Sequence, residues 1–172
     1  MRVVVDASIL IHLSRIGRFH LIKSLYGNAV ISSSVYEEVV EKGWGLPGSL
    51  ETEKAVHDGW IKVMSAANKW KVRELAKKFR IQMANAETVQ LALEVKPDFV
   101  LADEEEIRRL AEENGHKIRG CLGILIDGVR NGFISASEAK SGVKELRTSG
   151  YRVSREILKA FYALLKGLEE RR

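Results

Sequence analysis

The sequence of 172 residues has few of the side chains that hold small folds together through covalent links or soft metals. It has one cysteine, Cys121, which excludes an internal disulfide and a structural zinc site built on several thiolates. The histidines are scattered and form no pair with ligand spacing: His12, His20, His57 and His116. A chain of this length can instead bury one sizeable apolar core. The single cysteine also indicates a protein of a reducing compartment.

Long apolar runs are also absent. The apolar stretch at the N-terminus is interrupted by Asp6, His12 and Arg15 and contains no small-residue cleavage signal, so we expect neither a signal peptide nor a membrane span. The composition, with 45% hydrophobic and 30% charged residues, is ordinary for a folded globular protein. We therefore expect a cytoplasmic protein with a single domain over residues 1–172, on which helices at about 135–168 are packed.

The net charge of +5 is unevenly placed. Basic and acidic side chains cancel over residues 1–139, so the excess comes from residues 140–172. A second basic segment carries only Glu74 as an acid, and its cations are Lys69, Lys71, Arg73, Lys77, Lys78 and Arg80. Such segments are usually solvated helix faces, and they are also compatible with a polyanionic partner.

Short apolar runs alternate with helical patterns, which is typical of βαβ units and a mostly parallel sheet. The first strand, residues 2–5, contains three consecutive valines, as expected for a strand buried on both faces. Further strands are predicted at 29–31, 60–64, 99–102 and 117–119. Helices are predicted from about residue 8, over 19–25, from Ser32–Ser34 to about Lys42, before residue 60, and over 67–80, 85–95, 103–114, 122–130, 135–148 and 154–168.

Four acidic residues stand out by their position. Asp6 follows the first strand and Asp103 follows the strand at 99–102, and sites in parallel sheets form outside the carboxyl ends of the strands. Glu38 lies in the helix after the second strand, and Glu87 lies in the first turn of a later helix. Mg²⁺ and Mn²⁺ prefer oxygen ligands, and metals held by carboxylates supply the activated water and charge neutralisation that phosphodiester hydrolysis needs. These acids are therefore candidate metal ligands.

Each of these acids also has a simpler interpretation. Asp6 could cap the following helix, and Glu38 could be solvated beside Glu37 on an amphipathic helix. Glu87 could favour the dipole of its helix N-terminus. Asp103 could be an N-cap followed by three first-turn acids. Spacing alone does not prove that the four carboxylates converge.

A nucleotide-binding or phosphotransfer protein on a similar sheet is poorly supported. The sequence contains no G-x-x-x-x-G-K-[ST] and no G-x-G-x-x-G motif. After Asp6, the chain continues Ala7-Ser8, without the second acid two residues on that one class of phosphatases carries.

The four acids lie in segments whose order and spacing resemble a known family. The segments are Val-Val-Asp6-Ala-Ser8-Ile-Leu-Ile, Ile31-Ser-Ser-Ser-Val35-Tyr-Glu-Glu38-Val, Ala86-Glu87-Thr-Val-Gln-Leu-Ala-Leu-Glu, Phe-Val-Leu-Ala-Asp103 and Arg119-Gly120-Cys121-Leu122-Gly123. Together they resemble the PIN domain, specifically the stand-alone prokaryotic type related to toxin–antitoxin ribonucleases. The resemblance extends from residue 2 to about residue 160.

This resemblance implies a three-layer α/β/α fold and a Mg²⁺- or Mn²⁺-dependent nuclease, usually acting on single-stranded RNA. Carried over to this chain, it makes Asp6, Glu38, Glu87 and Asp103 the catalytic metal ligands, with Ser8 supporting Asp6. It also implies a homodimer and, for a toxin, a small antitoxin protein as partner.

Two departures from the family pattern motivate an alternative function. Relatives usually have Gly-Glu-Ala-Glu where this chain has Ala84-Asn85-Ala86-Glu87, and they tend to have a hydroxyl where this chain has Cys121. We expect Cys121 to be a buried apolar residue in a supporting position, because a thiol is a poor partner for Mg²⁺. The alternative is a catalytically weak module that binds RNA or a partner protein.

Overall fold

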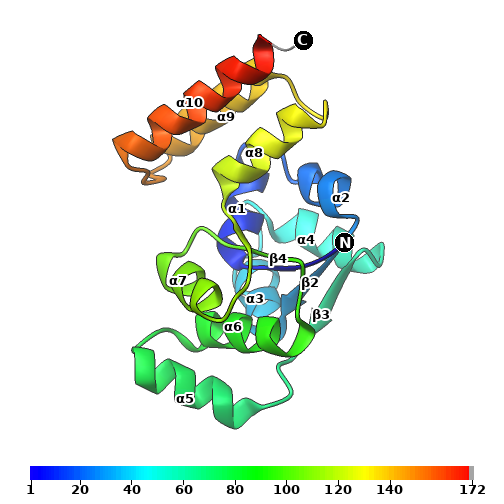
Figure 1. Cartoon of the computed structure of the whole chain (residues 1–172). Helices are drawn as coiled ribbons and strands as arrows, with labels where there is room; N and C mark the ends of the chain where they lie inside the picture. The colour runs from blue at the N-terminus through cyan, green and yellow to red at the C-terminus, as the bar shows by residue number, and fades with distance from the viewer. Residues whose placement is uncertain (171–172) are drawn as a thin grey trace.

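The computed structural model describes residues 1–170 and contains one sheet in this range, with five parallel strands (Figure 1). The order across the sheet is β3-β2-β1-β4-β5. The strands are β1 (Arg2–Val5), β2 (Asn28–Ser32), β3 (Ile61–Met64), β4 (Phe99–Leu101) and β5 (Ile118–Arg119). All pairings are parallel, so the predicted α/β class with a parallel sheet is confirmed.

Helices connect the strands, as the crossovers of a parallel sheet require. They are α1 (Ala7–Arg15), α2 (His20–Tyr26), α3 (Ser33–Tyr36), a π-helical turn η1 (Glu37–Glu41), α4 (Ser49–His57), α5 (Lys69–Phe79), α6 (Met83–Val95), α7 (Glu105–Glu113), α8 (Cys121–Arg130), α9 (Ala136–Thr148) and α10 (Arg155–Glu169). No helix within residues 1–170 is long and apolar enough to cross a membrane.

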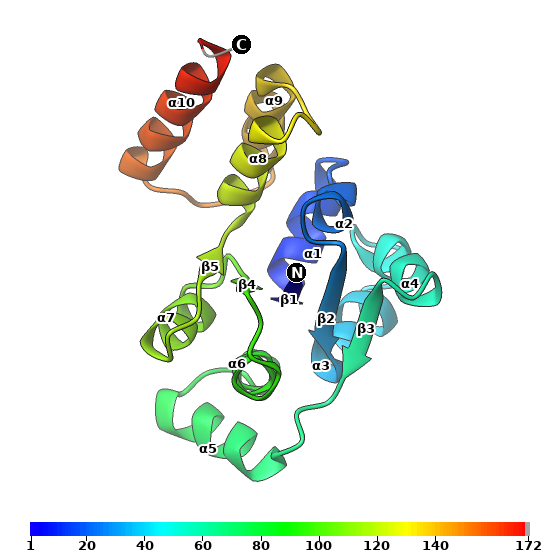
Figure 2. The same cartoon turned by 45° about the vertical axis from the view of Figure 1, so that its right-hand side comes forward.

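The valines of β1 show how the sheet is buried on both faces. Val3 and Val5 belong to one apolar cluster, whereas Val4 belongs to a second cluster on the other side, as the two-residue period of a strand demands. The first cluster contains the apolar residues of α1, α2 and α8. The second contains those of α5, α6 and α7, which Figure 2 shows together on their side of the sheet. The result is the predicted three-layer arrangement.

The C-terminal helices extend the first cluster beyond the sheet. Figures 1 and 2 both show α9 and α10 side by side and next to α8. Val143 and Leu146 of α9 are fully buried, as is Leu165 of α10, and all three belong to the same cluster as the residues of α8. Residues 136–169 are therefore packed on the sheet domain through α8.

The helix predicted from Ser32–Ser34 to Lys42 requires a correction, because it is not one regular α-helix. Ser32 caps α3 by accepting a hydrogen bond from the Val35 N–H (3.1 Å), and the chain then widens into the π-helical turn η1. The Lys42 N–H donates to the Glu37 carbonyl five residues earlier (2.8 Å). Single π-turns often lie at functional sites, and this one carries Glu38.

Candidate active site

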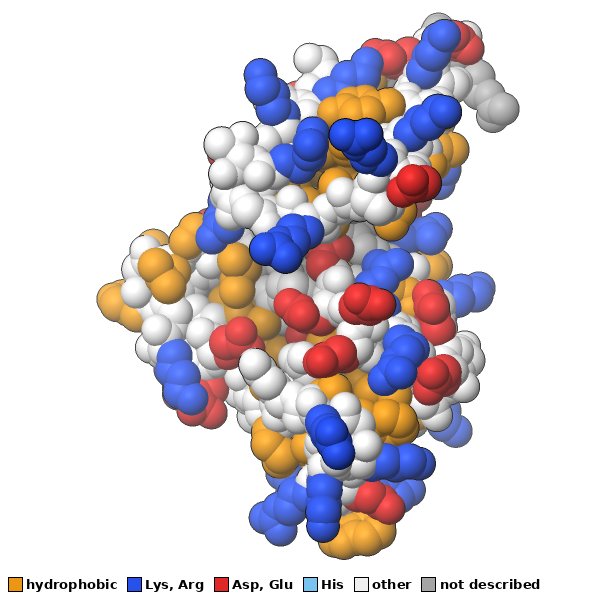
Figure 3. Space-filling view, turned by 90° about the vertical axis from the view of Figure 1, so that its left-hand side faces the viewer, with side chains coloured by type: hydrophobic (Ala, Val, Ile, Leu, Met, Phe, Trp, Pro, Cys, Tyr) orange, Lys and Arg blue, Asp and Glu red, His pale blue; other side chains and the backbone are white. Residues whose placement is uncertain are grey.

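An open cleft of about 720 Å³ lies where β1 and β4 end and their following helices begin. Arg80 contributes a cation to its lining, and the acidic residues that line it are Asp6, Glu38, Glu104, Glu105 and Glu106. Figure 3 shows acidic side chains gathered in the middle of one face, with lysines and arginines above and below them. Open α/β sheets bind ligands at this end of their strands, so the cleft is the candidate site.

Asp6 is fixed at the junction of β1 and α1. Its N–H donates to the Leu101 carbonyl (2.9 Å), which continues the pairing of β1 with β4. Its carboxylate oxygen Oδ2 accepts hydrogen bonds from the Ser8 N–H (3.1 Å) and the Ser8 hydroxyl (2.7 Å). Asp6 is therefore the N-cap of α1, as the simpler interpretation predicted, and it also lines the cleft.

The environment of Asp6 disfavours its charge. Asp6 is only 3% exposed, and this burial raises its pKa from 3.8 to about 6. The hydrogen bonds from Ser8 act in the opposite direction, and repulsion from Glu104 adds to the increase. A buried carboxylate with a raised pKa beside another carboxylate is typical of a functional site.

Glu38 and Glu104 reach the cleft from two other elements. Glu38 lies on η1, where partial burial and then repulsion from Glu104 raise its pKa, while Lys42 opposes the increase. Glu104 is the N-cap residue of α7 and comes directly after Asp103. Because Glu104 acts on the pKa of both Asp6 and Glu38, the three carboxylates form one electrostatic group.

Asp103 makes a separate set of hydrogen bonds. Its Oδ2 lies 2.8 Å from His12 Nδ1, and its Oδ1 accepts from the Cys121 N–H (2.9 Å) and the Tyr151 hydroxyl (3.3 Å). The Asp103 N–H donates to the Ser8 hydroxyl oxygen (3.1 Å), so Ser8 joins Asp6 to Asp103. The interpretation of Asp103 as the N-cap of α7 is wrong, because Glu104 occupies that position and the Asp103 carboxylate contacts the first residue of α8 instead.

Cys121 supports this arrangement through its backbone rather than its thiol. Its side chain is fully buried, and burial together with the nearby Asp103 carboxylate raises the thiol pKa well above its ordinary value. A thiol in this state is inert. The backbone N–H at the start of α8 is the group that contacts Asp103.

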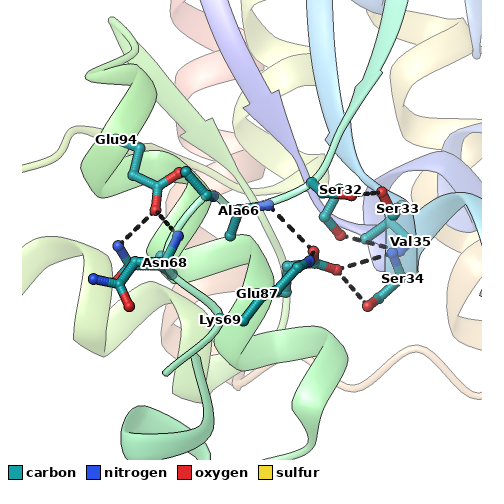
Figure 4. Close-up of polar contacts among 12 residues, drawn as sticks. Ser32, Ser33, Ser34, Val35, Ala66, Asn68, Lys69, Glu87 and Glu94 are labelled. Atoms are coloured by element: carbon teal, nitrogen blue, oxygen red, sulfur yellow. Dashed lines mark hydrogen bonds and ion pairs between the residues drawn. The ribbon is translucent and has the colours of Figure 1, made fainter. Parts of the chain in front are cut away.

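Glu87 is placed elsewhere. In the part of the chain that the structure describes, it lines a different hollow together with Ser34 and Lys69, and not the Asp6 cleft. Its carboxylate accepts from the Ser34 N–H (3.0 Å) and hydroxyl, the Ala66 N–H (3.3 Å) and Lys69 Nζ (2.8 Å), as Figure 4 shows. Burial would raise the pKa of Glu87, but these hydrogen bonds outweigh it and lower the pKa. Glu87 thus has a full set of protein partners.

The donor types in the cleft suit a divalent cation, although their placement does not close around one. Carboxylate oxygens are the ligands that Mg²⁺ and Mn²⁺ prefer. Burial, and then repulsion from Glu104, raises the pKa of Asp6 and Glu38, and a bound cation would offset both effects. Among residues 1–170, no three acidic, histidine or cysteine side chains lie close enough together to hold a metal ion. Glu38 and Glu104 are exposed, and exposed side chains change rotamer within nanoseconds.

Several residues of the cleft were not predicted from the sequence. Glu104 follows β4 one residue after Asp103, so its position in the sequence could have indicated a site residue in the same way. His12 lies four residues after Ser8 on α1, and this spacing places both on the face that lines the cleft. Asn85 lies in the first turn of α6 and reaches the cleft where Glu87 does not. Arg80 gave no local signal of this kind.

The fold and the cleft define an α/β protein with a carboxylate-lined site at the carboxyl end of a parallel sheet. Residues 2–167 match the family described as PIN domain, which is nearly the whole chain. The chain therefore belongs to the PIN-domain family, whose members are generally nucleases that use divalent metals. A comparison with curated proteins gives no match.

Proposed function

We propose that the chain is a Mg²⁺- or Mn²⁺-dependent ribonuclease that hydrolyses phosphodiester bonds of single-stranded RNA in the Asp6 cleft. The observation that carries this proposal is that carboxylates from three elements, Asp6, Glu38 and Glu104, line one cleft at the carboxyl ends of β1 and β4. Membership of the PIN-domain family supports phosphodiester hydrolysis as the reaction class.

In this proposal Asp6, Glu38 and Glu104 hold the metal. A divalent cation bound there would supply an activated water and neutralise charge on the phosphate. In the hydrolysis, a water oxygen forms a bond to phosphorus and loses a proton, while the bond from phosphorus to the leaving oxygen breaks and that oxygen takes up a proton. Ser8 holds the Asp6 carboxylate in place through two hydrogen bonds, so the geometry of this ligand is set before substrate arrives.

Other side chains of the cleft can contact the RNA. Arg80 carries a guanidinium group, which matches the geometry of a phosphate. His12 lines the same wall with Nδ1 held by Asp103, which leaves Nε2 as the ring nitrogen for a substrate. In this proposal Asp103 is a positioning residue that holds His12 and the start of α8. Glu87 is also a positioning residue, because it joins α6 to Ser34, Ala66 and Lys69.

Cleavage of a mixed-sequence, single-stranded RNA in the presence of Mn²⁺ tests the proposal. We expect the wild-type chain to cleave and the Asp6→Asn variant to be inactive, because the amide removes one anionic ligand and keeps the cap on α1. Glu51→Gln, an exposed substitution on α4, is the matched control and should cleave like the wild type. Equal activity of wild type and Asp6→Asn, or no activity with any metal, would contradict the proposal.

A second candidate, a catalytically weak module that binds RNA or a partner protein, is favoured by one observation. Asn85 lines the cleft, and its neutral amide adds no anionic ligand to this wall. RNA binding without measurable Mn²⁺ binding would favour this module over the nuclease.

Membership of the PIN-domain family also supports a proposal about partners. We propose that the chain is the toxin of a toxin–antitoxin pair, that it forms a homodimer and that a small antitoxin protein binds it. Co-expression with the protein encoded next to it, followed by measurement of the mass of the complex, tests this proposal. A chain that remains a monomer and is not inhibited by the neighbouring protein would contradict it.

A further inference from the structure

Helix α5 presents cations, one acid, Glu74, and an exposed tryptophan on its outer side. Trp70, Arg73 and Lys77 are spaced three and four residues apart, which places them along one side of the helix. All three are exposed, and the Trp70 side chain is 65% exposed. The opposite side of α5 is buried or half-buried in the second apolar cluster and consists of Val72, Leu75, Ala76 and Phe79. An exposed indole between cations has no role in the core.

The cations of α5 continue into the cleft. Arg73 lines the hollow beside Glu87, and Arg80, the C-cap residue of α5, lines the Asp6 cleft. The helix has 11 residues, which corresponds to about 16 Å at 1.5 Å per residue. Figure 3 shows lysines and arginines at the lower end of this face, where α5 lies, directly below the acidic middle. The positive side of α5 is therefore continuous with one wall of the acidic cleft.

The beginning of α5 is held firmly in place. Glu94 of α6 accepts hydrogen bonds from the backbone N–H groups of Ala67 (2.8 Å) and Asn68 (3.0 Å) (Figure 4). Glu87, two turns earlier on α6, binds the Ala66 N–H and Lys69 Nζ. Two carboxylates of α6 thus anchor the segment that leads into α5. A surface that is fixed before binding loses less conformational entropy when a ligand arrives.

We propose that the outer side of α5 binds single-stranded RNA, with Trp70 stacking on a base and Arg73, Lys77 and Arg80 contacting phosphates on the way to the Asp6 cleft. This inference rests on the proposed function for its choice of RNA. Cations that follow a backbone, combined with an aromatic side chain on which bases stack, are the features that bind single strands without sequence preference. A basic helix with a tryptophan can also lie on an anionic membrane, but that mode needs a free apolar face, and the apolar face of α5 is in the core.

The test measures binding without cleavage, so that it does not depend on catalysis. The anisotropy of a labelled single-stranded RNA is followed in EDTA, with wild type, Trp70→Ala and the double variant Arg73→Gln with Lys77→Gln. Trp44→Ala is the control for the tryptophan, because Trp44 is 63% exposed and lies on a loop. The control for the charges is Lys144→Gln with Arg147→Gln on α9, which removes the same charge from the other basic region.

We expect Trp70→Ala to weaken binding about tenfold, the effect of removing one base–aromatic stack, and Trp44→Ala to leave it unchanged. The double variant on α5 should make the slope of log K against log salt concentration shallower by about 0.7 for each phosphate that the protein no longer neutralises. The double variant on α9 should leave this slope unchanged. A duplex of the same sequence should bind more weakly, because its bases are already stacked.

Three results would overturn the inference. These are equal losses of affinity for Trp44→Ala and Trp70→Ala, an α9 variant whose salt dependence falls as much as that of the α5 variant, and tighter binding to phosphatidylserine vesicles than to RNA. If binding depends on Trp70 but the chain cleaves no RNA with any metal, the surface on α5 stands and the nuclease proposal fails. The reverse outcome would retain the nuclease and remove α5 from its substrate path.

Discussion

Replacing Asp6 by asparagine should make the protein more stable at pH 8 in metal-free buffer. Burial raises the pKa of Asp6 from 3.8 to about 6, so the charged form is disfavoured in the folded state. The difference between a pKa of 3.8 and one of about 6 corresponds to about 3 kcal/mol. The amide oxygen of asparagine can still accept from Ser8, but its NH₂ group needs a new partner, which costs about 1–3 kcal/mol when it is buried. We therefore expect a net gain of up to about 2 kcal/mol at pH 8.

The sign of the pH dependence follows from the direction of this shift. An acid whose pKa is raised by folding binds protons more strongly in the folded state, so its contribution is fully present below pH 3.8 and is lost as the pH rises through about 6. The wild type should therefore lose stability relative to Asp6→Asn between pH 4 and pH 8. Urea denaturation at pH 4.5, 6 and 8 in EDTA measures this, with Glu51→Gln as the control for loss of one negative charge.

Two results would refute this account of Asp6. One is a stability difference between Asp6→Asn and wild type that stays constant from pH 4.5 to pH 8. The other is an Asp6→Asn variant that is less stable than wild type at pH 8 and unchanged at pH 4.5. Either would mean that burial does not disfavour the Asp6 charge.

Three further predictions concern other parts of the same structure. Glu87→Gln should destabilise the fold by about 1–3 kcal/mol near neutral pH and by less below pH 4.5. Hydrogen bonds lower the Glu87 pKa, so the stability that the carboxylate contributes is lost as the pH falls. The same urea series measures this, and a larger loss at low pH would contradict it. Gly43→Ala should lower the free energy of unfolding by about 1–3 kcal/mol, because its Cβ would lie 2.5 Å from the Val39 carbonyl oxygen. It should also weaken Mn²⁺ binding by displacing η1, which carries Glu38. An unchanged melting temperature would refute this. Cys121 should resist iodoacetamide in the native protein and react only after unfolding, as mass spectrometry would show, and rapid native labelling would contradict its burial.

The sheet could be predicted from the sequence because its signal is local. Three valines in a row indicate a strand buried on both faces, and the structure places Val4 on the opposite side from its neighbours. The π-helical turn η1 could not be predicted, since the residues Glu37–Glu41 are compatible with an ordinary helix. The turn leaves the chain at Gly43 so close to the Val39 carbonyl that a Cβ there would lie 2.5 Å from its oxygen.

The site was only partly predictable from the sequence. Asp6 follows a strand directly, so its position at the carboxyl end of the sheet could be inferred from the sequence. Glu87 and Asn85 lie two residues apart on α6, and about 200° of helix rotation separates such positions, so they point to different sides. Which of them reaches the cleft depends on the rotation of α6 against the sheet. Contacts such as that of Ser34 with Glu87, which join segments far apart in the sequence, hold α6 in this rotation.

Calorimetric titration with Mn²⁺ tests most directly whether the Asp6 cleft is the metal centre. Wild type, Glu104→Gln and Glu87→Gln are compared under the same conditions. We predict that wild type binds Mn²⁺, that Glu104→Gln weakens binding by about tenfold or more, and that Glu87→Gln retains it. Loss of binding in Glu87→Gln with wild-type affinity in Glu104→Gln would contradict the account, as would a wild-type chain that binds no Mn²⁺.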